Sequence, residues 1–254
     1  MLKRYAGFAL ALITGLFFCA AAATADNAPQ TEAVVTMVQG TARVFTQGAP
    51  SGRLLHKGDK LRKEHEVKVA EKSRIEIRFP DGTVMRLSEK SRLKMSEVSY
   101  NKKTEGKNVK VDLSLGKLWA NVKKIVTPDS SVEVKTANAV AGVRGTVYRI
   151  NVEEDQSALV KVYDGSVYVA SPPKEATGKP PVQVAKPSEV PGPREVPKPF
   201  HEVTMEEWTV IVKAMQQISV SPQGVASKPQ DFDPKADADD WVKWNQERDK
   251  QTSL

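Results

Sequence analysis

The sequence has little cysteine, few aromatic residues and no long apolar run beyond its first 25 residues. A single Cys in 254 residues excludes a disulfide scaffold and a cysteine-rich zinc module. Gly and Pro number only 15 and 16, which excludes a collagen-like chain, and 40% hydrophobic residues exclude a wholly disordered one. Charged residues recur every few positions after Asp26, so the sequence predicts no membrane span after that point.

The first 25 residues have the three parts of a secretory signal peptide. Two basic residues precede the apolar residues 5–18, and Ala23-Thr24-Ala25 forms an Ala-x-Ala cleavage site. Cleavage there would remove Cys19 and leave a mature chain without a thiol. Two alternatives stay open, lipidation of Cys19 and retention of the segment as a membrane anchor. We predict a periplasmic or secreted protein whose signal peptide is residues 1–25.

The basic excess belongs to one part of the chain. Residues 33–171 carry 25 Lys plus Arg against 16 Asp plus Glu, whereas residues 172–254 carry 11 against 13. Alternation of these charges with apolar residues is typical of the solvated face of strands. In an exported protein such a positive field favours an envelope protein or an acidic glycan as partner. Nucleic acid is not expected, because no basic stripe is interleaved with aromatic residues.

Apolar residues repeat every two positions in short runs from Ala33 onward, and this period predicts strands with one buried face. We count about ten such strands, which favours an all-β sandwich or barrel. Turn signals separate the runs; Asp81-Gly82 and Asp164-Gly165 predict tight hairpins, and Gly116 predicts a further turn. Examples of the runs are Ile75, Ile77 and Phe79; Val109, Val111, Leu113 and Leu115; Leu118, Ala120 and Val122; Val167 and Val169.

Residues 172–199 hold nine of the 16 prolines and predict an extended linker. The tail, residues 200–254, contains two predicted helices. The first begins at a capping box starting at Thr204 and places Trp208, Ile211, Val212 and Met215 on one face, followed by a short strand near residues 217–221. The second begins among the aspartates at 237–240 and carries Trp241 and Trp244 three residues apart. These tryptophans predict a face docked on the domain; partner binding by Trp208, Trp241 and Trp244 is the alternative.

The sequence contains no recognisable catalytic constellation. His56, His65 and His201 fit no metal-ligand spacing, and neither a nucleophile elbow nor a phosphate loop is present. Carboxylates such as Asp59 and Glu153 lie in charged, turn-like surroundings that would not separate their pKa values. We therefore predict a non-enzyme with no catalytic, cofactor-binding or metal-binding residues and no cofactor.

The stretch from Val132 to Val152 contains Gly142-Val143-Arg144-Gly145-Thr146 and resembles the signature of the FecR domain. Asp81-Gly82-Thr83, the run from Leu115 to Trp119 and Tyr163-Asp164-Gly165 follow the family's order. The resemblance covers about residues 33–171 and implies a jelly-roll-like β sandwich. We interpret the signature residues as a tight bend that enters the strand at Val147, with ligand contact as the alternative. The signature residues are Gly142, Arg144, Gly145 and Thr146.

The best-known FecR regulators place a cytoplasmic sigma-factor-binding segment and a transmembrane helix before this domain. Only four residues precede the apolar run here, so the anti-sigma activity is not expected. The prediction is a non-enzymatic exported binding, scaffold or sensing module of the bacterial cell envelope that engages a protein or glycan through its sandwich. The alternatives are an envelope glycan-processing enzyme and a signalling relay with a separate membrane partner. The ligand and the oligomeric state stay open.

Overall fold

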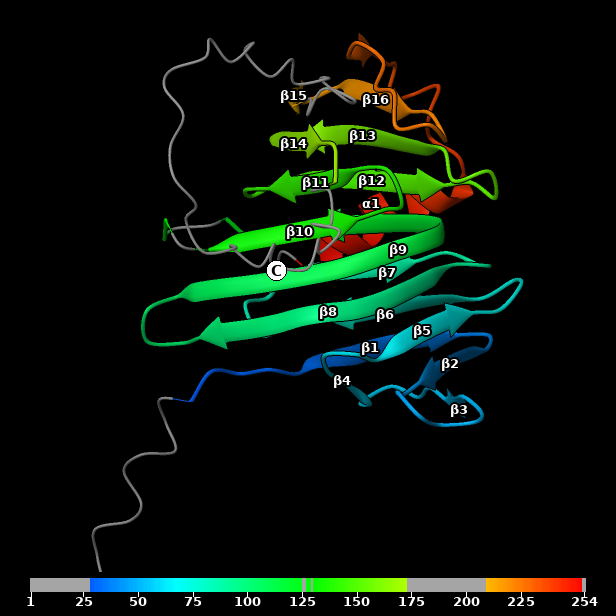
Figure 1. The fold of residues 1–254 in the computed structure, drawn as a ribbon, viewed down its shortest axis with the longest axis vertical. Helices are drawn as coiled ribbons and strands as arrows, with labels where there is room; N and C mark the ends of the chain where they lie inside the picture. Colours follow the sequence, from blue (N-terminus) through cyan, green and yellow to red (C-terminus); the bar gives the residue numbers. More distant parts are fainter. Residues whose placement is uncertain (1–27, 125–126, 129, 173–208, 253–254) are drawn as a thin grey trace, which may run out of the picture.

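The computed structural model describes residues 28–124, 127–128, 130–172 and 209–252. Within these ranges the strands form two layers packed face to face, with a helix outside them (Figure 1). The predicted all-β class is therefore confirmed, whereas the jelly-roll topology stays a prediction. The predicted signal peptide and all but the first residue of the predicted linker lie outside the described residues.

We call the first layer sheet A. Its strand order is β3, β2, β5, β8, β9, β10, β11, β14 and β15, and neighbours are antiparallel except for β9 and β10. Its strands are β2 (Ala42–Phe45), β3 (Arg53–Leu54), β5 (Glu66–Val69), β8 (Arg92–Asn101), the first part of β9 (Gly106–Asn121), β10 (Ser131–Lys135), β11 (Val140–Val143), β14 (Ser166–Ala170) and β15 (Thr209–Lys213).

The second layer is sheet B, in which all neighbours are antiparallel. Its order is β4, β1, β6, β7, β9, β12, β13, β16 and β17. Besides the second part of β9 it contains β1 (Ala33–Gln39), β4 (Lys60–Leu61), β6 (Arg74–Arg78), β7 (Val84–Leu87), β12 (Val147–Val152), β13 (Ala158–Asp164), β16 (Gln216–Val220) and β17 (Gln230–Asp231).

Strand β9 belongs to both layers. Its residues 106–115 pair with β8 in sheet A, and its residues 118–121 pair with β7 in sheet B. Gly116 lies where the strand bends from one layer to the other, with φ +92°, and a Cβ there would collide with Ser91. The predicted turn at Gly116 is therefore wrong, because the left-handed residue bends one continuous strand instead of ending it.

The interior lies between the two layers and is filled by the alternate residues that the period predicts. On β9, for example, Val109, Val111 and Leu113 point inward from sheet A, and Leu118 and Ala120 point inward from sheet B. Phe79, Ile75 and Ile77 are among the largest fully buried side chains. The side chains between these positions lie on the outer faces of the sandwich, where the candidate functional residues are found.

The predicted first tail helix is wrong where the structure describes it. Residues Thr209–Lys213 form β15, because the β-branched run Thr209-Val210-Ile211-Val212 pairs with β14 and buries Val212 between the layers. The short strand predicted after it is confirmed as β16. The second predicted helix is also confirmed, as α1 (Asp240–Thr252), which lies against the outer face of sheet B (Figure 1).

Candidate functional site

The signature residues 144–146 form a bend through which the chain crosses from β11 in sheet A to β12 in sheet B. Gly145 has φ +69°, and an ideal Cβ there would lie 3.1 Å from the Cα of Lys124. Thr146 is buried, and its hydroxyl donates a hydrogen bond of 2.9 Å to the carbonyl oxygen of Ser166. Arg144 is exposed, and Gly142 lies in β11 on the outer face. The bend is thus formed by a left-handed glycine and a hydroxyl-to-backbone hydrogen bond.

Asp164-Gly165, next to this bend, joins β13 in sheet B to β14 in sheet A. The predicted hairpin at this Asp-Gly is therefore wrong, since β13 pairs with β12 and β16 whereas β14 pairs with β11 and β15. Asp81-Gly82, in contrast, joins the paired strands β6 and β7 as predicted. The hydroxyl of Thr146, through its hydrogen bond to Ser166, links two neighbouring crossings between the layers.

We expect Gly145→Ala to lower the free energy of unfolding by about 2 kcal/mol or more, because a side chain is strained at positive φ and would press on the Lys124 backbone. The matched control is Gly48→Ala. Gly48 also has positive φ, at +80°, but nothing lies within 4 Å of where its Cβ would stand. Gly48→Ala should therefore lower the free energy of unfolding by only about 1 kcal/mol. Urea unfolding followed by circular dichroism measures both; equal losses would show that the contact with Lys124 contributes nothing.

The outer face of sheet A carries an exposed apolar strip at one end, on β11, β14 and β15. Tyr168 and Ile211 lie opposite each other in register and are 52% and 59% exposed. Gly142 lies on the other side of Tyr168, and a Cβ at this glycine would lie 3.7 Å from the tyrosine ring. We call this strip the open patch; its residues are Val140, Gly142, Tyr168, Ala170 and Ile211.

Sequence reasoning missed Tyr168 and placed Ile211 on a helix. The signal that could have found them is the β-branched composition of residues 209–212 together with the period of β14. Charged residues continue the same row away from the patch, since Glu133 lies opposite Gly142 and Lys110 lies opposite Glu133. The open patch is thus an apolar area with a charged border, at the edge of a sheet.

The outer face of sheet B is covered instead of open. Five side chains occupy one row across five neighbouring strands, paired in register from β6 to β13. Residues 232–252, which we call the tail segment, lie over this row. The row consists of Glu76, Arg86, Trp119, Arg149 and Lys161.

Arg86 is the centre of the first half of the row and has no exposed side-chain surface. Its Nε donates to Glu76 at 2.8 Å, and its Nη1 donates at 2.7 Å to Asp249 of α1. The indole N–H of Trp119 donates to the other Asp249 oxygen at 2.9 Å. Burial alone raises the pKa of Glu76, but hydrogen bonds from Arg248, Thr36 and Arg86 outweigh it and lower this pKa to about 2. Glu76 is therefore ionised at neutral pH.

The second half of the row binds one carboxylate of the tail segment, that of Asp237. Arg149 Nη2 lies 2.6 Å and Lys161 Nζ 2.7 Å from its Oδ1, and the Tyr163 hydroxyl donates to its Oδ2 at 2.5 Å. Burial, and donation of its proton to Asp237, raise the pKa of Tyr163 above its usual value. Tyr163 therefore stays a hydrogen-bond donor to this carboxylate throughout the physiological range.

The tryptophans named by the sequence analysis have different positions. Trp241 is buried with Val242, Trp119 and Tyr163 in a cluster separate from the main interior. Trp244 stacks on Trp241 with ring centroids 5.3 Å apart, and the Arg74 guanidinium lies 4.7 Å from its ring centre. Trp208 lies outside the described residues. Trp241 and Trp244 are thus engaged within the chain itself.

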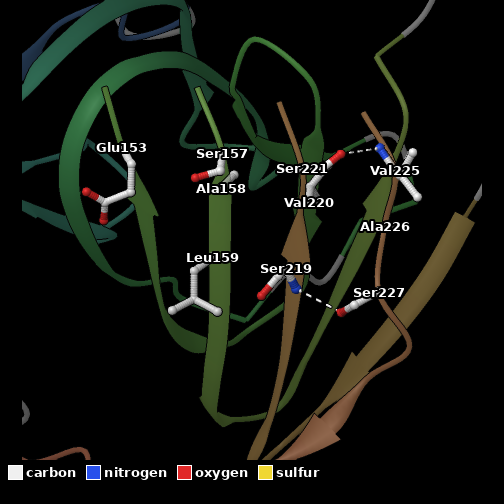
Figure 2. Close-up of a pocket in the computed structure, with 10 residues that line it drawn as sticks. All are labelled: Glu153, Ser157, Ala158, Leu159, Ser219, Val220, Ser221, Val225, Ala226 and Ser227. Atoms are coloured by element: carbon white, nitrogen blue, oxygen red, sulfur yellow. Dashed lines mark hydrogen bonds between the residues drawn. The ribbon is translucent and has the colours of Figure 1, made fainter. Parts of the chain in front are cut away.

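A pocket of about 400 Å³ lies beside β13 and β16 (Figure 2). Four serines and Glu153 line it together with small apolar residues. Ser221 and Ser227 accept hydrogen bonds from the backbone N–H groups of Val225 and Ser219, so these two hydroxyls maintain the local turn. In Figure 2 the Glu153 carboxylate stands apart from the serine hydroxyls, so no activated nucleophile is assembled among the residues drawn.

Of the histidines and carboxylates considered in the sequence, His56 and Asp59 lie together, with the imidazole Nδ1 4.0 Å from a carboxylate oxygen. Asp59 pairs with Arg53 at 2.8 Å in an exposed turn, and hydrogen bonds from Arg53 and from the His56 backbone lower its pKa. Burial lowers the pKa of His65, and His201 lies outside the described residues. Among the residues that the structure describes, no group of three His, Cys, Asp or Glu side chains could hold a metal ion. In the same ranges no helix has the length and apolarity that a membrane crossing requires.

Residues 65–168 match the model of a family described as FecR protein. This part of the chain is therefore similar to a FecR domain. It includes the signature bend, the open patch except Ala170 and Ile211, and the whole covered row. Two crystal structures of a candidate anti-sigma factor from Parabacteroides distasonis ATCC 8503, at 1.65 and 2.50 Å, align at 17% identity with a TM-score of 0.43. The alignment covers 67% of this chain and 61% of that one. No curated protein matches the chain.

Proposed function

We propose that the chain is a non-enzymatic, exported sensing or scaffold module of the cell envelope that binds a protein partner at the open patch. The observation that carries this proposal is the pair Tyr168 and Ile211, which lie side by side at the edge of sheet A and are each more than half exposed. Clustered exposed apolar side chains with a charged border are typical of protein interaction sites. The FecR domain supports a regulatory role for such an interaction.

The position of β15 favours an extended segment of a protein as the occupant. Among the described residues, β15 pairs with β14 on one side and with no strand on the other. An extended partner segment can add to such an edge by main-chain hydrogen bonds, while pockets between side chains select its sequence. Lys213 is the sole charged residue of β15. The strand therefore has few of the charged side chains that usually keep an edge strand from pairing with another chain.

An acidic glycan is the alternative ligand of this face, and a glycan-processing enzyme is the alternative class. A sugar ring would stack on Tyr168, but the in-register neighbours of this residue, Gly142 and Ile211, offer no polar side chain to orient it. The described pocket beside β13 offers no activated nucleophile or carboxylate pair. Protein binding is therefore the function that we put forward.

Photo-crosslinking in cells tests the proposal. A photoreactive residue placed at Lys213, at the end of β15, should give an adduct of defined mass with one envelope protein. Tyr168→Asp should abolish that adduct, because a charge would have to be desolvated in the patch. The matched control is Val225→Asp, since Val225 is 64% exposed but lies outside the patch, beside the pocket in Figure 2. An adduct that survives Tyr168→Asp, or turnover of a glycan by the purified protein, would contradict the proposal.

A further inference from the structure

The tail segment is bound to sheet B by ion pairs with the covered row and by the aromatic cluster around Trp119. We propose that the covered row is a binding site for an acidic segment of a partner protein that includes an amphipathic helix, and that the tail segment is an exchangeable ligand of this site. The proposal is independent of the open patch, which lies on the other sheet. It rests on the geometry of the row, on the separation of the tail from the interior, and on unsatisfied donors beneath the tail.

The row presents two carboxylate-binding positions. At the first, Arg86 and Trp119 donate to the two oxygens of Asp249. At the second, Arg149, Lys161 and Tyr163 converge on Asp237. Between the two positions lies the aromatic surface of Trp119 and Tyr163, whose ring centroids are 4.7 Å apart and which contact Trp241. The chemistry therefore fits a segment that combines two separated carboxylates with an apolar side chain between them.

The sandwich does not depend on the tail segment for its interior. The main hydrophobic cluster extends along the chain to Val220, with Ala226 packed against it, and contains no residue of α1. The apolar contacts of α1 form the separate cluster around Trp241 and Trp119. Release of the tail segment would therefore uncover the row without opening the space between the layers. Buried ion pairs also add little net stability compared with apolar contacts, which favours reversible docking.

The tail segment leaves donors of the site unused. Among the described residues, Arg86 Nη2 and Arg149 Nε are buried without a hydrogen-bond acceptor, as is the indole N–H of Trp241 in the tail. A buried donor without an acceptor weakens an interface. A partner helix with further carboxylates or carbonyl groups at these two guanidinium groups would bind more favourably than the tail does. The complementarity extends to overall charge, since residues 232–252 carry six acidic and four basic residues and residues 33–171 are strongly basic.

The test uses the full chain and a fluorescent peptide of residues 232–252 as the probe. In the wild-type chain the resident tail competes, so the peptide should bind weakly. Asp237→Asn with Asp249→Asn in the chain weakens the resident tail, so the apparent affinity for the wild-type peptide should rise by at least about tenfold. A peptide carrying both Asn changes, and a scrambled peptide of equal charge, are the matched controls and should not bind.

A direct readout of release accompanies the binding curve. Hydrogen exchange of the α1 amides should become faster in the variant chain, while the amides of β9 and β12 keep their protection. The single variant Asp249→Asn gives the same comparison if the double variant does not fold. Two results would overturn the proposal: α1 amides as protected in the variant as in the wild type with no peptide bound, or peptide binding that the Asn changes and the scrambled order leave unaltered.

Discussion

Replacing Arg86 with alanine should lower the free energy of unfolding by about 3 to 5 kcal/mol. Arg86 has no exposed side-chain surface and pairs with both Glu76 and Asp249. Its removal would leave the buried carboxylate of Glu76 and the partly buried one of Asp249 with fewer donors, and such unpaired charges are costly. Urea unfolding followed by circular dichroism and by tryptophan emission measures the loss.

The matched control for this variant is Arg78→Ala. Arg78 ends β6, which pairs with the strand of Arg86, but its side chain is exposed. Arg78→Ala should therefore change the free energy of unfolding by no more than about 0.5 kcal/mol. The double variant Glu76→Gln with Arg86→Met should recover part of the stability, because it removes charge from both partners. If Arg86→Ala and Arg78→Ala destabilise the protein equally, the buried ion network does not fix the tail in the way described.

Truncation of the chain should have a larger effect that depends sharply on the position of the cut. Removal of residues 209–254 takes away three fully buried side chains of β15 and β16: Val212, Ile218 and Val220. At about 1.5 to 3 kcal/mol for each, the loss is about 5 to 9 kcal/mol, which approaches the whole stability of a domain. We expect this truncated chain to show no cooperative unfolding transition.

Removal of residues 232–254 should instead leave a folded sandwich with a lower melting temperature. This cut removes α1 and Asp237 but no member of the main hydrophobic cluster. It uncovers Trp119, which is fully buried in the intact chain, so tryptophan emission should shift to longer wavelength. Calorimetry and emission spectra measure both effects. Loss of the folded state after this shorter cut would mean that the tail segment is part of the folding unit, and would contradict the separation of the two clusters.

Much of the interior could be predicted from the sequence, because burial on one face of a strand imposes a period of two that is visible residue by residue. Ile75 and Ile77, or Val109 and Val111, point inward as the alternation predicts. The same reasoning failed at residues 209–213, where Trp208, Ile211, Val212 and Met215 matched a helical spacing. Pairing with β14 overrode that spacing, since Val212 fills the interior as part of a strand.

The two Asp-Gly turns make different connections, and the sequence did not distinguish them. Asp81-Gly82 and Asp164-Gly165 have the same residues, yet the first closes a hairpin and the second carries the chain between layers. Both satisfy the need for positive φ at glycine. Which strand lies next to which depends on contacts far apart in the sequence, so the identical signal leads to different topology.

The sequence by itself determined the all-β class, the FecR resemblance and the helix at the end of the chain, because hydrophobic period, glycine placement and helix-end charges are local properties. Only the tertiary structure decided which outward-facing charges are buried. The strand pattern places four charged side chains on the solvent side of sheet B: Glu76, Arg86, Arg149 and Lys161. They are nevertheless almost fully buried, because the tail segment covers them. Likewise, Tyr168 and Ile211 meet across strands separated by more than 40 positions in the chain, and no local pattern encodes that contact.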